Sequence, residues 1–395
     1  MVMASNCSSW RVESWLDSLA SRTTFSLLYG VVGVSSLAGN TLILLVLGQC
    51  RDMRTTTNIF IGNLAVCDLL LTLSSHWLTP VYAFRQTWDY GRLACVGWST
   101  VTTVMVFVSA GTLIAIAFDR YLVIVHPFRP GCRSVWWRPG ALALIWLAAG
   151  TVAAPLGYFA RYEVINGCNR SYPLCLTDWQ PRVARVYYGI VTFALKSILP
   201  FGLITYFYSC INYTLLIQYQ RVEYARGLRS RATSIRRKQK LQRILIVMVI
   251  IFLLCSLPSD AVNIVKDLNW YHRSPISVGK FIKSVGLICH LLGMTANLWN
   301  PILYAFCNEN FKREIQNRWC DITYACRSFR QRRHSLGARV RGSHPQRVFE
   351  ASPHAALTPV TPCPNSRTLS ENNNIVVAHC NGKSSSSNEQ KEVYV

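Results

Sequence analysis

Seven long stretches of apolar, sparsely charged sequence restrict the folds available to this chain. They lie at about 25–48, 58–82, 95–125, 141–160, 186–214, 241–266 and 281–306. Each has roughly the 20 residues that an α-helix needs to cross a bilayer. The fourth stretch is short and the seventh carries many polar groups. The pattern predicts an all-α fold, a bundle of seven transmembrane helices.

The amount and placement of charge support a membrane protein. Only 15% of the 395 residues are charged and 51% are hydrophobic, whereas soluble domains carry about 25% charged residues. The net charge of +23 is collected in loops that flank the apolar stretches. Lipid headgroups and membrane topology account for basic residues in such loops, so we expect no nucleic-acid partner.

The spread of lysine and arginine sets the expected topology. The loops after the first, third and fifth stretches are basic, and the loops between them are mixed. Basic loops stay in the cytoplasm. We therefore expect an extracellular amino terminus (1–24), the helix bundle (25–306), an amphipathic helix (307–320) and a disordered cytoplasmic tail (321–395), in the plasma membrane. Residues 1–22 lack the apolar core of a signal peptide, so the first stretch is expected to be an uncleaved anchor.

Candidate modification and docking sites lie outside the apolar stretches. Asn6 and Asn169 stand in glycosylation sequons. Cys320 and Cys326 are either palmitoylated or ordinary free thiols. The terminal Val395, with its carboxylate, suits addition to a PDZ sheet edge. Four cysteines lie on the predicted outer side and allow three pairings: Cys7, Cys95, Cys168 and Cys175.

Polar residues within the stretches predict an interior cluster, because they are costly in lipid. Asp68 lies in the middle of the second stretch. Amide and hydroxyl side chains are available in the first, third and seventh stretches: Asn40, Ser109, Asn297 and Asn300. Together they are expected to hold either a small cation such as Na⁺ or a structural network filled with water.

A second polar group is expected nearer the outer side. Lys196 lies one turn before Pro200, and Asp260 lies two residues after Pro258. If the fifth and sixth stretches are neighbours, these charges can pair, which costs less than leaving both unpaired. The pair is either a ligand anchor or a structural ion pair. Three further residues are expected to line the same cavity: Thr102, Asn263 and His290.

The third stretch ends in Asp119, Arg120 and Tyr121. An Asp beside an Arg at the wet end of a membrane helix can form a neutral pair that later releases the guanidinium. This arrangement predicts a conformational switch, not an active site. Four prolines mark expected kinks in the helices: Pro80, Pro200, Pro258 and Pro301.

These residues resemble the motifs of rhodopsin-like (class A) G-protein-coupled receptors, with one motif in each stretch. The motifs are Gly39-Asn40, Asn63-Leu64-Ala65 with Asp68, Asp119-Arg120-Tyr121, Trp146, Pro200 with Tyr208, Phe252 with Pro258, and Asn300-Pro301-Ile302-Leu303-Tyr304. Residues 107–130 and 264–267 resemble receptors for prokineticin and prolactin-releasing peptide. Residues 300–312 resemble receptors for neuropeptide Y and Arg-Phe-amide peptides. The resemblance therefore implies the peptide-receptor subgroup.

The resemblance also implies partners and roles. An extracellular peptide is the expected ligand, and a heterotrimeric G protein, arrestin and receptor kinases are the expected intracellular partners. Outward movement of the fifth and sixth helices is expected to rearrange Arg120, Tyr208 and Tyr304. Phe128 is expected to contact the G protein.

The family's disulfide implies a bond between Cys95 and Cys175, which leaves Cys168 free or paired with Cys7. No cofactor is expected apart from the possible Na⁺.

Differences from the family pattern narrow the ligand class. Monoamine receptors have an Asp where this chain has Thr102, and opsins have a retinal-binding Lys where it has Met294. Monoamines and retinal are therefore not expected. Several receptors for Arg-containing peptides present an acid at the position of Asp267, which suggests a basic peptide terminus. Ser256 replaces the usual Trp of the sixth helix, so activation must differ in detail.

Other classes of protein fit less well. A transporter or channel would show inverted repeats or broken half-helices, and the sequence shows no internal repeat. The sequence also lacks metal-ligand spacing and a nucleophile motif, so no enzyme is expected. Ser256 keeps two alternatives open, a non-signalling partner subunit and a constitutively active receptor without a peptide ligand.

Overall fold

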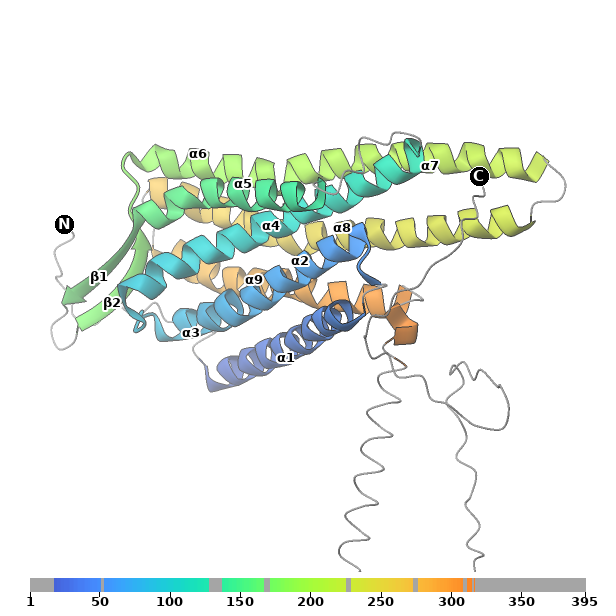
Figure 1. The fold of residues 1–395 in the computed structure, drawn as a ribbon. Coiled ribbons are helices and arrows are strands. Elements are labelled where there is room, and N and C mark those ends of the chain that lie inside the picture. The colour runs from blue at the N-terminus through green and yellow to red at the C-terminus, as the bar shows by residue number, and fades with distance from the viewer. Residues whose placement is uncertain are drawn as a thin grey trace, which may run out of the picture. The chain divides into compact units, whose positions relative to one another are not determined.

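A computed structural model describes residues 18–50, 53–127, 137–166, 171–224, 229–272, 276–307, 311–314 and 316. The chain divides into two units, Met1–Lys312 and Arg313–Val395, and the fold below is that of the first unit. Its described residues form seven helical rods that run side by side (Figure 1). The rods are α1 (Leu19–Gln49), α2 (Thr56–Leu71) with η3 (Thr72–His76) and α3 (Trp77–Arg85), α4 (Gly91–Val125), α5 (Trp137–Phe159), α6 (Arg182–Phe193) with η5 (Ala194–Ile198) and α7 (Leu199–Tyr224), α8 (Arg229–His272) and α9 (Ile276–Cys307).

Six of the described rods are long and apolar enough to cross a membrane. The remaining rod, α9, is long enough at 32 residues, and it is the one that the sequence marks as rich in polar groups. The predicted all-α bundle is therefore confirmed. Helix α8 has 44 residues and is about 66 Å long. Because this is about twice the thickness of the hydrocarbon core, α8 extends well beyond the membrane.

The rods close into a ring, with α5 packed on α4. Helix α1 packs against α2 and α9, α4 packs against α2, α5 and α7, and α8 packs against α7 and α9. A partly buried chain of hydrogen bonds joins three of them. The Asn63 amide donates to Thr112 Oγ1 at 2.8 Å, and Trp146 Nε1 donates to Asn63 Oδ1 at 3.1 Å. These bonds fix α2, α4 and α5 to one another.

Two of the predicted proline kinks are preceded by wide π-helical turns. Proline has no N–H to donate to the carbonyl four residues earlier, and its ring collides with that carbonyl. For Pro80 that carbonyl belongs to His76, which lies in the wide turn η3. For Pro200 it belongs to Lys196, which lies in the wide turn η5. The wider turn relieves the collision and changes the direction of nearby side chains. Pro258 and Pro301 lie within continuous α-helix.

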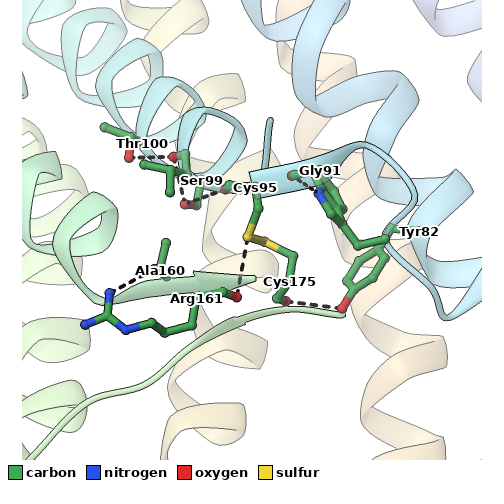
Figure 2. The surroundings of a disulfide bond; sticks show 10 residues. Tyr82, Gly91, Cys95, Ser99, Thr100, Ala160, Arg161 and Cys175 are labelled. Atoms are coloured by element: carbon green, nitrogen blue, oxygen red, sulfur yellow. Dashed lines mark hydrogen bonds between the residues drawn. A yellow bond between two sulfur atoms is a disulfide. The ribbon is translucent and has the colours of Figure 1, made fainter. Parts of the chain in front are cut away.

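A β-hairpin lies at one end of the bundle (Figure 1). Strands β1 (Ala160–Asn166) and β2 (Ser171–Thr177) pair antiparallel, with Tyr162 opposite Cys175. Cys175 forms the expected disulfide with Cys95 of α4 (Figure 2). Tyr82 of α3 donates a hydrogen bond to the Cys175 carbonyl at 3.2 Å. The hairpin is thus attached both to α3 and to α4.

Helix α1 contains two glycines that we expect to respond oppositely to alanine. A Cβ at Gly39 would lie 2.7 Å from Pro301 Cβ, whereas nothing lies within 4 Å of a Cβ at Gly30. Gly39→Ala should therefore destabilise the protein by about 1–3 kcal/mol through overpacking. Gly30→Ala should stabilise it by about 0.5–1 kcal/mol, because alanine loses less backbone entropy in a helix. Thermal unfolding in detergent checks both. A stabilising Gly39→Ala would contradict the close packing of α1 on α9.

Candidate functional site

A cavity of about 350 Å³ lies inside the bundle. Its wall includes all six residues predicted to bind ligand: Thr102, Lys196, Asp260, Asn263, Asp267 and His290. It also includes the four residues predicted to hold a sodium ion: Asp68, Ser109, Asn297 and Asn300. The structure therefore brings both sets together in one cavity, although binding itself stays a prediction.

The predicted pair of Lys196 and Asp260 is present across α8 and the wide turn η5. Lys196 Nζ donates to Asp260 Oδ1, and Ser197 Oγ donates to Asp260 Oδ2 at 2.9 Å. The side chains of Lys196 and Asp260 are only 17% and 5% exposed. Both donors come from consecutive residues of η5, so the π-helical turn aims two groups at one carboxylate.

Asp267 is bound by an arginine that the sequence reasoning missed. Arg185 Nε of α6 donates to Asp267 Oδ1 at 2.5 Å, and Arg185 also donates to Thr177 Oγ1 of β2. Gly189 permits this approach, because a Cβ there would lie 2.7 Å from Asp267 Oδ2. The available signal was a basic residue immediately before the fifth stretch. The sequence did not say which acid it would reach.

His290 is held by hydrogen bonds to two neighbouring rods. Its Nδ1 lies 2.9 Å from the Tyr29 hydroxyl of α1, and its Nε2 lies 3.2 Å from Ser75 Oγ of η3. His76 lies beside them, with its Nε2 2.6 Å from the Tyr29 carbonyl oxygen. This cluster joins α1, η3 and α9. The sequence reasoning did not find Tyr29, Ser75 or His76.

The deep part of the cavity contains the predicted polar cluster around Asp68. The Asn300 amide donates to Asp68 Oδ2 at 2.8 Å. Asn40 donates to the Asn297 backbone carbonyl at 3.0 Å. Ser109 Oγ is buried and interacts with the Cys67 thiol. Carboxylate, hydroxyl and amide oxygens are the ligands that hard cations prefer, so the residues fit the proposed ion.

The predicted switch, Asp119-Arg120-Tyr121, lies near the carboxyl-terminal end of α4. Arg120 is 3.7 Å from Asp119 Oδ2, which also accepts a hydrogen bond from Thr57 Oγ1 at 3.0 Å. Tyr208 and Tyr304 are buried within electrostatic reach of the Arg120 guanidinium. Arg120 Nε is buried without a hydrogen-bond partner among the residues described. The guanidinium is therefore incompletely paired in this conformation.

Two other predicted switch residues have structural partners. The Tyr121 hydroxyl lies 3.1 Å from His126 Nε2, and Pro301 is buried against Gly39.

Several predicted residues lie outside the described part of the chain. They are Asn6, Cys7, Phe128, Cys168, Asn169, Cys320, Cys326 and Val395. Residues 311–314 of the predicted amphipathic helix are helical, and Phe311 is buried. The expectations for these sites and for the tail stay predictions.

A family model described as "7 transmembrane receptor (rhodopsin family)" matches residues 39–304. This chain belongs to that family. The receptor is therefore a multi-pass membrane protein that transmits signals and is not an enzyme, as predicted.

Similar proteins include the neuropeptide F receptor of Drosophila melanogaster, 33% identical over 74% of this chain and 61% of that protein. The QRFP-like peptide receptor of Branchiostoma floridae is 30% identical over 74% of this chain and 77% of its own length. The neuropeptide Y receptor type 6 of Mus musculus is 29% identical over 74% of this chain and 80% of its own length.

Proposed function

We propose that the receptor binds an extracellular peptide in its cavity and activates a heterotrimeric G protein. The main support for this proposal is the similarity of the chain to three receptors named for peptides, those for neuropeptide F, QRFP-like peptide and neuropeptide Y. The cavity wall adds support. It combines aromatic and aliphatic residues with two ion pairs, Lys196–Asp260 and Arg185–Asp267. A peptide offers both apolar side chains and charged groups to such a wall.

Transmission to the G protein rests on two arrangements of the helices. Peptide binding favours the arrangement in which α7 and α8 move outward at the G-protein end. Arg120 then leaves Asp119 and joins Tyr208 and Tyr304, and Phe128 contacts the G protein. Peptide and G protein therefore strengthen each other's binding. A sodium ion at Asp68, with Ser109, Asn297 and Asn300, favours the resting arrangement.

The proposal includes the receptor's placement and its further partners. The receptor lies in the plasma membrane with its amino terminus outside and its carboxyl terminus in the cytoplasm. Arrestin and receptor kinases bind the cytoplasmic face, and a PDZ protein binds at Val395. Asn6 and Asn169 are glycosylated, and Cys320 and Cys326 are palmitoylated.

A peptide screen tests the function directly. Cells expressing the receptor should respond to at least one of a peptide library that includes neuropeptide F, neuropeptide Y and QRFP-like peptides, read as calcium and cyclic AMP. Membranes from the same cells should then show peptide-dependent nucleotide exchange on a G protein. Arg120→Leu is the matched control, expected to keep peptide binding and lose exchange. A receptor that reaches the surface but supports no exchange with any peptide would contradict the proposal.

We predict opposite effects of removing the two partners of the Arg185–Asp267 pair. A basic group of the peptide that binds Asp267 must first displace Arg185, which already holds the carboxylate at 2.5 Å. Asp267→Ala should therefore lower the potency of an Arg-containing peptide by roughly 10–100-fold, the usual cost of losing a partly buried charge partner. Arg185→Gln should raise the potency, because it removes the competitor. Dose–response curves measure both.

Asp89→Ala provides the control for this pair of variants. It removes an acid from an exposed pair with Arg85, in which the two side chains are 62% and 46% exposed. Such a pair contributes little, so the potency should not change. If Asp267→Ala leaves potency unchanged, Asp267 is not the anchor for a basic group. If Arg185→Gln lowers potency as much as Asp267→Ala does, the peptide binds the intact pair and does not displace it.

A further inference from the structure

The part of the cavity wall formed by α6, η5 and α8 has more basic than acidic groups. Among the described residues, its basic members are Arg185, Lys196 and Lys266, and its acidic members are Asp260 and Asp267. Two of the basic residues are matched with the two acids, in the pairs Lys196–Asp260 and Arg185–Asp267. The third basic residue, Lys266, is therefore left without an acid to balance its charge.

The neighbours of Lys266 do not supply that acid. In the described ranges of the chain, Lys266 forms no ion pair. Asp267, the next residue on α8, attracts Lys266, but Arg185 already holds that carboxylate at 2.5 Å and itself repels Lys266. The wall's remaining described acid, Asp68, belongs to α2 and accepts a hydrogen bond from Asn300. One carboxylate thus serves two basic residues at this place.

The ammonium group of Lys266 lies against helix α9. A Cβ at Gly286 would lie 2.9 Å from Lys266 Nζ, so the absence of a side chain at Gly286 makes room for the ammonium group. The thiol of Cys289, about one turn further along α9, lies within electrostatic reach of the same group. A thiol is only a weak acceptor. Lys266 is also an exposed residue, so a ligand in the cavity can reach its ammonium group.

The proposed displacement of Arg185 by the peptide increases this excess of positive charge. A basic group of the peptide at Asp267 adds a cation to a region that already contains Arg185 and Lys266. Nearby like charges repel each other, more strongly where water is partly excluded. An acidic group in the same part of the ligand offsets this repulsion. Lys266 can receive that group, because it lies next to Asp267 on α8 and lines the same cavity.

We infer that the ligand presents a carboxylate to Lys266, beside the basic group that it presents to Asp267. The chemical class is a peptide end in which a guanidinium or ammonium group has a carboxylate as its neighbour. A carboxyl-terminal arginine with a free carboxylate belongs to this class, and so does an arginine next to an acidic side chain. An arginine amide without a neighbouring acid does not. The inference rests on the proposed peptide function and adds a second charged group to the ligand.

The test uses purified receptor without a G protein, and three small probes. Nα-benzoyl-arginine has a terminal carboxylate, Nα-benzoyl-argininamide is the matched probe without it, and benzoyl-Arg-Asp-amide has its carboxylate on a side chain. Thermal unfolding is followed against the concentration of each probe. We expect benzoyl-arginine to act at a roughly 3–10-fold lower half-maximal concentration than its amide, the usual value of one accessible charge pair. An equal advantage for benzoyl-Arg-Asp-amide would show that the site accepts either source of the carboxylate.

Variants at one position make the test specific to Lys266. Lys266→Gln should make the half-maximal concentrations of benzoyl-arginine and its amide equal, whereas Lys266→Arg should keep the preference for the acid. If Lys266→Gln does not fold, Lys266→Met removes the same charge and should give the same result. Arg92→Gln is the matched control. It removes a positive charge from an exposed residue of α4 that is not part of the cavity wall, so it should keep the preference.

Equal half-maximal concentrations of acid and amide on the unaltered receptor would overturn the inference, and so would the absence of a response to every probe. A preference that survives Lys266→Gln would also overturn it, because the carboxylate would then bind another group. These outcomes are separate from the proposed function. A receptor without this preference that activates a G protein with an amidated peptide keeps its function, and a receptor with the preference that activates no G protein does not.

Discussion

Replacing Lys196 by methionine is expected to lower the free energy of unfolding of the receptor by about 3–5 kcal/mol. The change leaves the Asp260 carboxylate buried and without its cation, and a buried charge without a partner is one of the costliest defects in a folded protein. Asp260 is 5% exposed at its side chain, and among the described residues it keeps the hydrogen bond from Ser197 Oγ. That single hydroxyl cannot replace an ammonium group.

A double variant separates the value of the pair from the cost of an unpaired charge. Lys196→Met with Asp260→Leu removes both charges and fills similar volume, a kind of replacement that is often neutral or even stabilising. We expect it to recover most of the stability lost in Lys196→Met. The Ser197 hydroxyl can then bond to a carbonyl of its own helix. Thermal unfolding in detergent and the surface expression of each variant are the measurements.

Arg85→Ala, which breaks the exposed pair with Asp89, is the control for these variants and should cost less than about 1 kcal/mol. A double variant as unstable as Lys196→Met would show that the pair itself stabilises the fold. Lys196→Met with unaltered stability would contradict the expected cost of leaving Asp260 without Lys196.

The pairing of Lys196 with Asp260 illustrates what a sequence can predict in a membrane protein. Two charges in neighbouring apolar stretches have few acceptable environments, so each predicts the other as its partner. The same reasoning placed Asp68 with Asn300. Hydropathy gave the seven helices for a similar reason, because the length of an apolar stretch is set by the thickness of the bilayer.

Arg185 shows where that reasoning ends. Water can solvate a charged side chain near the end of a membrane helix at little cost in free energy. The position of Arg185 in the sequence therefore does not predict a partner for it. Its bond to Asp267 crosses 82 residues of sequence and depends on how α6 is rotated against α8. The wide turn η5 influences this rotation. The position of Pro200 predicted a kink there but did not predict a π-helical turn. Likewise, the motif comparison identified Ser256, but only the packed helices show that it lines the cavity.

The second large effect concerns the disulfide between Cys95 and Cys175. Its cysteines are 80 residues apart in sequence, and the loop-entropy model gives about 4.5 kcal/mol for a loop of this size. Measured losses are usually about 2–5 kcal/mol. We expect Cys95→Ala with Cys175→Ala to lower the unfolding free energy within this range. Cys210→Ala, which removes a free cysteine of α7, is the control and should have a much smaller effect.

The same double variant should also change how Arg185 competes with the peptide for Asp267, through the hairpin. Strand β2 carries both Cys175 and Thr177, and Thr177 accepts a hydrogen bond from Arg185. A hairpin detached from α4 no longer positions Arg185 against Asp267. In the disulfide-free background, Arg185→Gln should therefore change peptide potency much less than it does with the disulfide intact. Equal effects of Arg185→Gln in both backgrounds would show that α6 alone positions Arg185, and the disulfide would then act on stability without shaping the peptide site.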